Sequence, residues 1–173
     1  MKRINNKKEG TFVPSFIFKM DIIEQLTVWT NEYLSSHLFL VNIEWKVGSK
    51  KVSIFVDGDN GVSIDECRML SKHLSGHLDA MEYGEEPYTM EVSSPGAENP
   101  LILFRQYPKH IGRELKVILL QNTELLGKLV KIEGDIITLH LKDTKKDYKA
   151  KETILKEINI NDIKESTVQI SFK

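Results

Sequence analysis

The hydrophobic positions in the first half of the chain change from a helical spacing to a strand-like one. A helical stripe opens at Asp21, and Glu24 follows three residues later as in a capping box. The stripe comprises Ile22, Leu26, Trp29, Tyr33, Leu34 and Leu38. Apolar and polar residues then alternate over residues 41–47 and 52–56, on either side of Gly48. This alternation predicts a β-hairpin.

A second helix and a third strand follow the hairpin. Ser63 and Glu66 form another capping-box pattern at the start of this helix. Its apolar face is predicted to carry Ile64, Cys67, Leu70, Leu74, Leu78 and Met81. Residues 88–92 alternate as a strand. Two helices that cover one face of three strands make an α+β domain, which we place at residues 20–93. Residues 1–19 show no helical period, and we expect a flexible tail there.

A constrained linker is predicted at residues 94–100. Its motif is Ser93, Ser94, Pro95 and Gly96. Proline fixes φ and glycine accepts a positive φ, so Pro95 and Gly96 suit the centre of a type II turn. A plain turn inside one domain is the alternative interpretation.

Five short strand-like segments in residues 101–173 predict a small β-barrel as the C-terminal domain. These segments are 114–120, 125–133, 135–141, 149–155 and 167–172. A brief helical pattern precedes them at residues 101–107, and one helical turn is expected at residues 161–164. Gly127 lies inside a predicted strand, which is typical of a bulge or a bend.

Composition and charge narrow the class of protein. The chain has 173 residues, of which 40% are hydrophobic and 28% are charged, as in a folded globular protein. One cysteine excludes an intrachain disulfide, and no apolar run approaches the ~20 residues of a membrane span. We therefore expect a cytoplasmic protein.

The net charge of −1 divides into +4 for residues 1–20, −9 for residues 21–100 and +4 for residues 101–173. This division suggests different partners for the two halves, or simply solvated surfaces.

Motifs for catalysis or cofactor binding are weak. His73 and His77 lie four residues apart, as two zinc ligands can, but the catalytic Glu is missing and a surface pair is favoured. The loop at residues 57–61 has the wrong register for calcium. Its G-x-x-G pattern carries Asp57 and Asp59, which would repel phosphates. No nucleophile elbow, P-loop or dinucleotide fingerprint occurs. We predict no enzyme activity, no metal and no cofactor.

Several segments together have a more specific pattern. They are residues 52–57, 61–67, 78–79, 90–96, 100–101, 112–119 and 126–129. The sequence E-V-S-S-P-G at residues 91–96, with its spacing from residues 61–67, resembles the ribosome maturation factor RimP family. Glu98 keeps an acidic residue that follows the glycine in this family, whereas Asn99 stands at an arginine position.

The resemblance implies an N-terminal α+β domain followed by a small Sm-like β-barrel. It also implies a non-enzymatic assembly factor for maturation of the small (30S) ribosomal subunit, which binds the pre-subunit transiently. The implied partners are the small-subunit precursor, its basic ribosomal proteins and ribosomal RNA, with no membrane and no small-molecule substrate. An Sm-like RNA-binding regulator that acts on free RNA is the alternative.

The charge division predicts which residues meet which partner. The acidic segment should be repelled by phosphate, so its exposed acids are expected to contact basic proteins. These acids are Asp57, Asp59, Asp65, Glu82, Glu85 and Glu86. A lysine-rich loop is expected to lie near RNA, although a solvated loop fits the same pattern. Its lysines are Lys142, Lys145, Lys146, Lys149 and Lys151.

Overall fold

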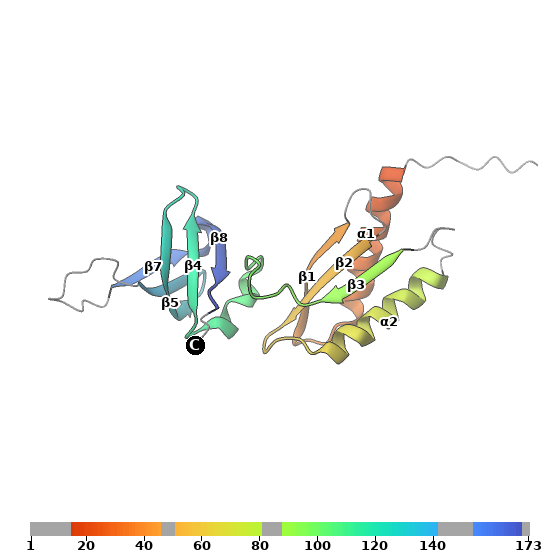
Figure 1. Cartoon of the computed structure of the whole chain (residues 1–173), viewed down its shortest axis with the longest axis horizontal. Coiled ribbons are helices and arrows are strands. Elements are labelled where there is room, and N and C mark those ends of the chain that lie inside the picture. Colours follow the sequence, from red (N-terminus) through yellow and green to blue (C-terminus); the bar gives the residue numbers. More distant parts are fainter. Residues whose placement is uncertain (1–14, 46–50, 81–87, 142–153, 171–173) are drawn as a thin grey trace, which may run out of the picture.

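Two β-sheets lie at opposite ends of an elongated molecule. The computed structural model describes residues 15–45, 51–80, 88–141 and 154–170. The first sheet contains strands β1–β3 and the second contains β4–β8. Figure 1 shows the green segment after β3 crossing from one sheet to the other.

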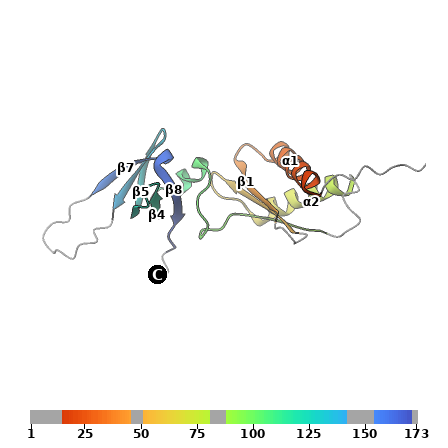
Figure 2. The ribbon, with the colours of Figure 1, turned by 90° about the horizontal axis from the view of Figure 1, so that it is seen from above.

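The N-terminal sheet has the predicted α+β architecture. Strands β1 (Leu38–Trp45) and β2 (Lys51–Gly58) pair antiparallel, which confirms the hairpin. Strand β3 (Thr89–Ser93) pairs parallel to β2, so the chain crosses over through helix α2 (Ile64–Ala80). Figure 2 shows α2 and helix α1 (Ser15–Tyr33) on the same side of the sheet. The sheet order is therefore β1-β2-β3 with one face covered by helices.

Helix α1 starts earlier than its sequence pattern predicts. It begins at Ser15, whereas the capping-box pattern placed the start at Asp21, so the predicted flexible tail is wrong for residues 15–19. No proline or glycine stands between these two positions, so nothing in the sequence ends a helix there.

Neither α1 nor any other helix in the described part of the chain is long and apolar enough to cross a membrane.

The N-terminal core lies between the helices and the sheet. Val52, Ile54 and Val56 alternate on the buried face of β2. The buried residues that pack against them are Ile22, Leu26, Leu70, Leu74 and Leu78. The predicted face of α2 is thus correct for its three leucines, but wrong for Ile64, which is 79% exposed. Ile64 precedes Leu70 by six residues, or about 600° of helix rotation, which leaves the two side chains about 120° apart. Met81 lies outside the described residues.

The predicted second capping box is confirmed at the start of α2. The Ser63 backbone N–H donates to Glu66 Oε2 at 2.7 Å, and the Glu66 N–H donates to Ser63 Oγ at 3.2 Å. The Ser63 hydroxyl also donates to Glu66 Oε2 at 2.7 Å. These hydrogen bonds, with a smaller effect of His37, lower the pKa of Glu66 to about 2. The capping box therefore holds this carboxylate in its charged form.

The C-terminal sheet is antiparallel throughout and has the order β7-β6-β5-β4-β8. Its strands are β4 (Glu114–Leu119), β5 (Glu124–Glu133), β6 (Ile136–Leu141), β7 (Leu155–Asn159) and β8 (Ile163–Val168). Three short 3₁₀ helices accompany them: η1 (Phe104–Gln106), η2 (Pro108–His110) and η3 (Ile160–Asp162). Among the described strand pairs, β7 and β8 remain edges, so the predicted closed barrel is not confirmed.

The last strand is displaced from its predicted position. The alternation placed it at residues 167–172, but β8 runs from Ile163 to Val168. Pairing with β4 fixes the position of β8, because Leu115 of β4 lies opposite Val168 in the ladder. The Tyr107 ring joins the core beneath this sheet, with Leu115 and Val168.

Gly127 is required by a close approach between strands. A Cβ at this position would lie 2.7 Å from the His140 carbonyl oxygen of the paired strand β6. The register shift of this strand lies elsewhere, between Leu129 and Lys131. Gly127 therefore marks a tight contact and Val130 marks the irregularity.

Candidate functional site

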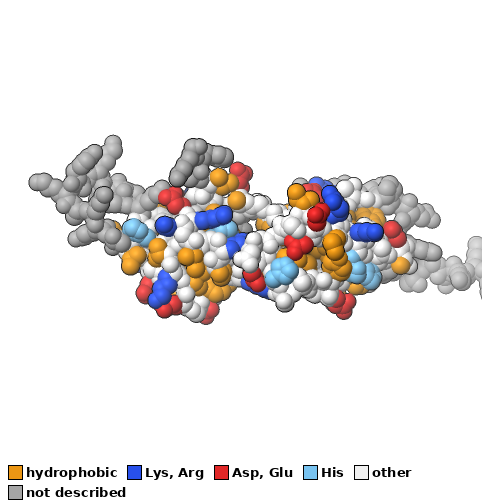
Figure 3. All heavy atoms as spheres, turned by 90° about the horizontal axis from the view of Figure 1, so that it is seen from below, with side chains coloured by type: hydrophobic (Ala, Val, Ile, Leu, Met, Phe, Trp, Pro, Cys, Tyr) orange, Lys and Arg blue, Asp and Glu red, His pale blue; other side chains and the backbone are white. Residues whose placement is uncertain are grey.

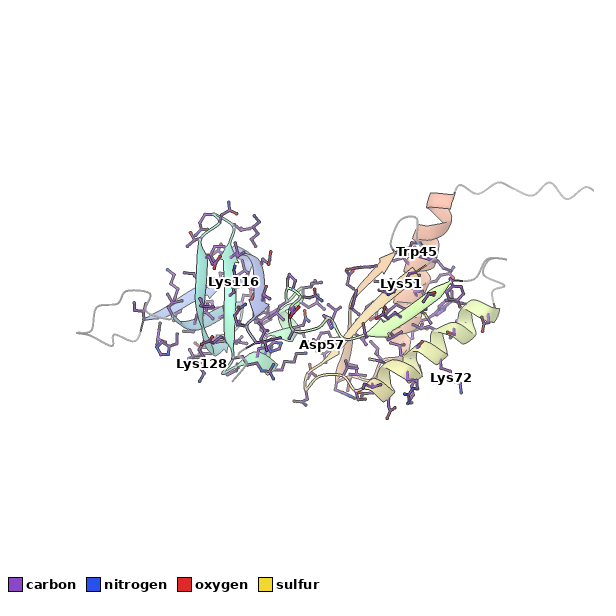
Figure 4. All side chains as sticks on the ribbon, viewed as in Figure 1. Trp45, Lys51, Asp57, Lys72, Lys116 and Lys128 are labelled. Atoms are coloured by element: carbon purple, nitrogen blue, oxygen red, sulfur yellow. The ribbon has the colours of Figure 1, made fainter. Side chains whose placement is uncertain are left out.

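Asp57 is the central residue of a polar junction between the two sheets. It lies near the end of β2, is 4% exposed, and points toward the segment that leads to β4 (Figure 4). Its Oδ1 accepts a hydrogen bond from the Gly58 backbone N–H at 2.8 Å and forms an ion pair with Lys109. Its Oδ2 accepts from Gln106 Nε2 at 3.1 Å. Both carboxylate oxygens therefore have partners, and two of these partners, Gln106 and Lys109, come from the C-terminal half.

Gln106 fixes the segment between the linker and β4. Its side chain is buried, and its Oε1 accepts hydrogen bonds from the backbone N–H groups of Ile102 and Leu103 at 2.8 and 3.0 Å. Its amide nitrogen at the same time donates to Asp57. One side chain therefore ties the turn of η1 to the end of β2.

Asp59 and Arg105 form a second link beside the first. Arg105 Nε and Nη2 donate to Asp59 Oδ1 and Oδ2, both at 2.8 Å, in a bidentate pair. Arg105 Nη2 also donates to the Ser36 carbonyl at 2.5 Å, and the guanidinium lies 4.6 Å from the centre of the Phe39 ring. The Arg105 hydrogen bond is the main cause that lowers the pKa of Asp59. Arg105 thus contacts three separate points of the N-terminal half.

The linker passes over the same junction. Gly96 has φ +77°, which confirms the positive φ predicted for it, and the Asn99 side chain hydrogen-bonds to the Pro95 carbonyl. The linker then joins the second sheet, because the Leu101 N–H donates to the Ser166 carbonyl at 2.7 Å. A hollow of about 210 Å³ lies between the linker, Asp57 and η2.

His110 lies in the wall of this hollow. It is 8% exposed, and its Nδ1 has no hydrogen-bond partner among the described protein groups. Burial lowers the pKa of His110, and the charges of Lys109 and Arg113 lower it further. The imidazole therefore adds no positive charge to the junction near neutral pH.

The structure changes the interpretation of the predicted contact acids. Asp57 was expected to be exposed, and this is wrong, because Lys109 and Gln106 cover it. Asp59 is exposed but paired with Arg105, and Asp65 is exposed near the start of α2 beside Arg68. The remaining predicted acids, Glu82, Glu85 and Glu86, lie outside the described residues. The predicted lysines Lys142, Lys145, Lys146, Lys149 and Lys151 also lie outside them.

Sequence reasoning missed the basic side of this junction. Arg105, Gln106 and Lys109 carry no motif of their own, and only the charge division pointed toward them. Two acids from the −9 segment meet two cations from the +4 segment. Part of the asymmetry therefore joins the two halves of this chain to each other.

The junction has the chemistry of a structural connection. Its carboxylates are occupied by hydrogen bonds and ion pairs, and no activated nucleophile lies beside them in the described chain. In the same residues there is no group of three or more His, Cys, Asp or Glu side chains that could hold a metal ion. Its evident effect is to fix the placement of the two sheets.

A comparison with known families identifies the N-terminal half. Residues 31–98 match the RimP N-terminal domain. The match covers β1, β2, α2 and β3, together with the linker as far as Glu98. It confirms the resemblance drawn from the E-V-S-S-P-G segment.

Proposed function

From the match to the RimP N-terminal domain, we propose that this chain is a ribosome maturation factor of that family and assists maturation of the small (30S) ribosomal subunit. The match at residues 31–98 is the observation that carries this proposal. The protein would bind the precursor transiently, in the cytoplasm, and would perform no catalysis. Binding shifts a folding equilibrium only if the protein prefers one state of the precursor over another.

We propose that the protein acts as two domains held in a fixed relation. These domains are residues 20–93 and 101–173, joined by residues 94–100. Each sheet has its own hydrophobic core, which supports the division. The Asp57 and Asp59 contacts support a preferred orientation, because they connect the two halves directly. A partner that touches both halves would then meet surfaces already arranged for it.

The second domain is proposed to be an Sm-like barrel. Five antiparallel strands in the order β7-β6-β5-β4-β8 support this, since closure needs only the two edge strands to meet. Its partner would be ribosomal RNA, contacted through the lysine-rich residues 142–151. Basic ribosomal proteins would meet the N-terminal acids that stay open to solvent, with Asp65 as the described example. Asp57 is assigned to the junction instead.

Sucrose-gradient fractionation of cell extract tests the proposal. We expect the protein to sediment with small-subunit particles and to concentrate on immature ones. Sedimentation only with small free RNA would favour the alternative regulator of free RNA and overturn the proposal. Sedimentation at the position of the free protein would also overturn it.

A matched pair of variants tests the role of the junction. Lys109→Met removes the ion pair to Asp57, whereas Lys156→Met makes the same chemical change at an exposed position on β7. We expect the first to weaken cosedimentation and the second to leave it unchanged. Equal binding by both variants would show that a fixed orientation is not needed.

A further inference from the structure

Four aromatic rings form a continuous array across the outer side of α1 and α2. Trp29 stacks on His77 with ring centres 4.7 Å apart, and Tyr33 stacks on His73 with centres 4.3 Å apart. The two histidine ring centres lie 4.6 Å apart, and their planes are inclined at 76°. The right-hand part of Figure 3 shows histidine side chains at the surface next to hydrophobic ones.

The histidines of this array are open to solvent on one side. Both are half-buried, and both line a shallow hollow of about 730 Å³. No hydrogen bond joins the ring nitrogens of His73 or His77 to another described residue. Imidazole nitrogens that are accessible and unbonded are available as ligands.

We propose that His73 and His77 together chelate one late first-row divalent cation, such as Cu²⁺, Ni²⁺ or Zn²⁺. Residues at i and i+4 lie on the same helix face, one turn apart. From a metal–nitrogen distance of about 2.1 Å and a coordination angle between square and tetrahedral, two imidazole ligands should have centres about 4.5–5.2 Å apart. The observed 4.6 Å falls within this range.

The stacking explains why this pair differs from two ordinary surface histidines. Trp29 and Tyr33 come from α1 and lie against the rings of α2, so the motion of each imidazole is already restricted. A ligand that is positioned in advance loses less conformational entropy on binding. Lys72 also lines the hollow, on the outer side of α2 (Figure 4), and its charge opposes a bound cation. Chelation by two nitrogens has to outweigh that repulsion.

The site would leave part of the coordination shell open. Within the described residues no third His, Cys, Asp or Glu joins the pair. The remaining positions would be filled by water or by a donor from another molecule. This inference is independent of the proposed role in ribosome maturation, because it concerns the helices and not the junction.

Trp29 provides a direct readout. The chain has two tryptophans, so Trp45→Phe leaves Trp29 as the only one. We expect Ni²⁺ to quench the fluorescence of this tag-free variant saturably and with one-site stoichiometry. Zn²⁺, which does not quench, should compete with it. By the Irving–Williams order, Cu²⁺ should bind more tightly than Ni²⁺, and Mg²⁺ should have no effect.

Ring-conserving variants separate chelation from packing. In the Trp45→Phe background, His73→Phe and His77→Phe keep an aromatic ring in each stack but remove the nitrogens. Each should weaken Ni²⁺ binding by about tenfold or more. His140→Ala, which changes a histidine on β6, should leave the affinity unchanged. The proposal is overturned if the parent shows no saturable quenching, if either Phe variant keeps the parent affinity, or if the His140 variant loses it.

Discussion

Replacing Lys109 by methionine tests the ion pair at the centre of the junction. The side chains of Asp57 and Lys109 are 6% and 19% exposed, so water solvates neither fully. Methionine fills similar space but leaves the Asp57 carboxylate with only the hydrogen bonds from Gly58 and Gln106. A buried charge that loses its partner is strongly destabilising.

The expected loss is about 3 kcal/mol in the free energy of unfolding, at the lower end for breaking a buried ion pair. The lower end applies because Asp57 keeps two hydrogen bonds and Lys109 is partly solvated. Asp57→Asn should cost less, about 1–2 kcal/mol, because the carboxylate charge disappears with the change. The double variant should cost less than the sum by about 1 kcal/mol or more.

Urea unfolding of the four proteins in this cycle provides the measurement. Trp29 and Trp45 both lie in the N-terminal half, so fluorescence follows the part of the molecule that carries Asp57. Strictly additive losses would refute the coupling. A negligible loss for Lys109→Met would show that the two halves are not held together through Asp57.

Three further outcomes follow from individual residues. Leu74→Ala should lower the free energy of unfolding by about 2–5 kcal/mol, measured by thermal melting, because Leu74 is fully buried. Met69→Ala is the control: Met69 is 59% exposed, and the change should have little effect. Gly96→Val opposes the φ of +77° and should weaken sedimentation with small subunits while circular dichroism still shows both sheets; unchanged sedimentation would contradict a constrained linker. Glu66 has a folded pKa of about 2, below its ordinary 4.5, so its contribution to stability is present above pH 4.5 and is lost as the pH falls toward 2. Glu66→Gln should flatten the acid limb of stability measured by urea unfolding, and an unchanged limb would mean that the Ser63 hydrogen bonds do not persist in solution.

Local patterns predicted the features that depend on neighbours along the chain. The hairpin, the capping box and the buried face of α2 at Leu70 and Leu74 all follow from short-range spacing. The positive φ of Gly96 follows from its own residue type. The same reasoning was wrong for Asp57. Its position in a predicted loop suggested an exposed side chain, but the residues that bury it lie about fifty positions later in the sequence.

The predicted position of β8 was wrong for the same reason, because it depends on residues far away in the sequence. Apolar and polar residues alternate in residues 167–172 but not in residues 163–168, where four polar residues separate Ile163 from Val168, and only the ladder with β4 selects Ile163–Val168. The charge division was observed correctly, but a net charge does not reveal whether its partner is another molecule or the other half of the chain. The contact between Arg105 and Asp59 shows that part of the acidic charge is paired with the other half of the same chain.

The pairing of β4 with β8 has a consequence for the order in which the chain folds during synthesis. The N-terminal sheet is complete once β3 has left the ribosome, whereas the second sheet receives its edge strand β8 only after strands β4–β7 have been made. The Leu101 N–H reaches its acceptor, the Ser166 carbonyl, only at that stage. The nascent N-terminal sheet could therefore form with Asp57 still hydrated, and Asp57 is buried only once Gln106 and Lys109 have followed it out of the ribosome.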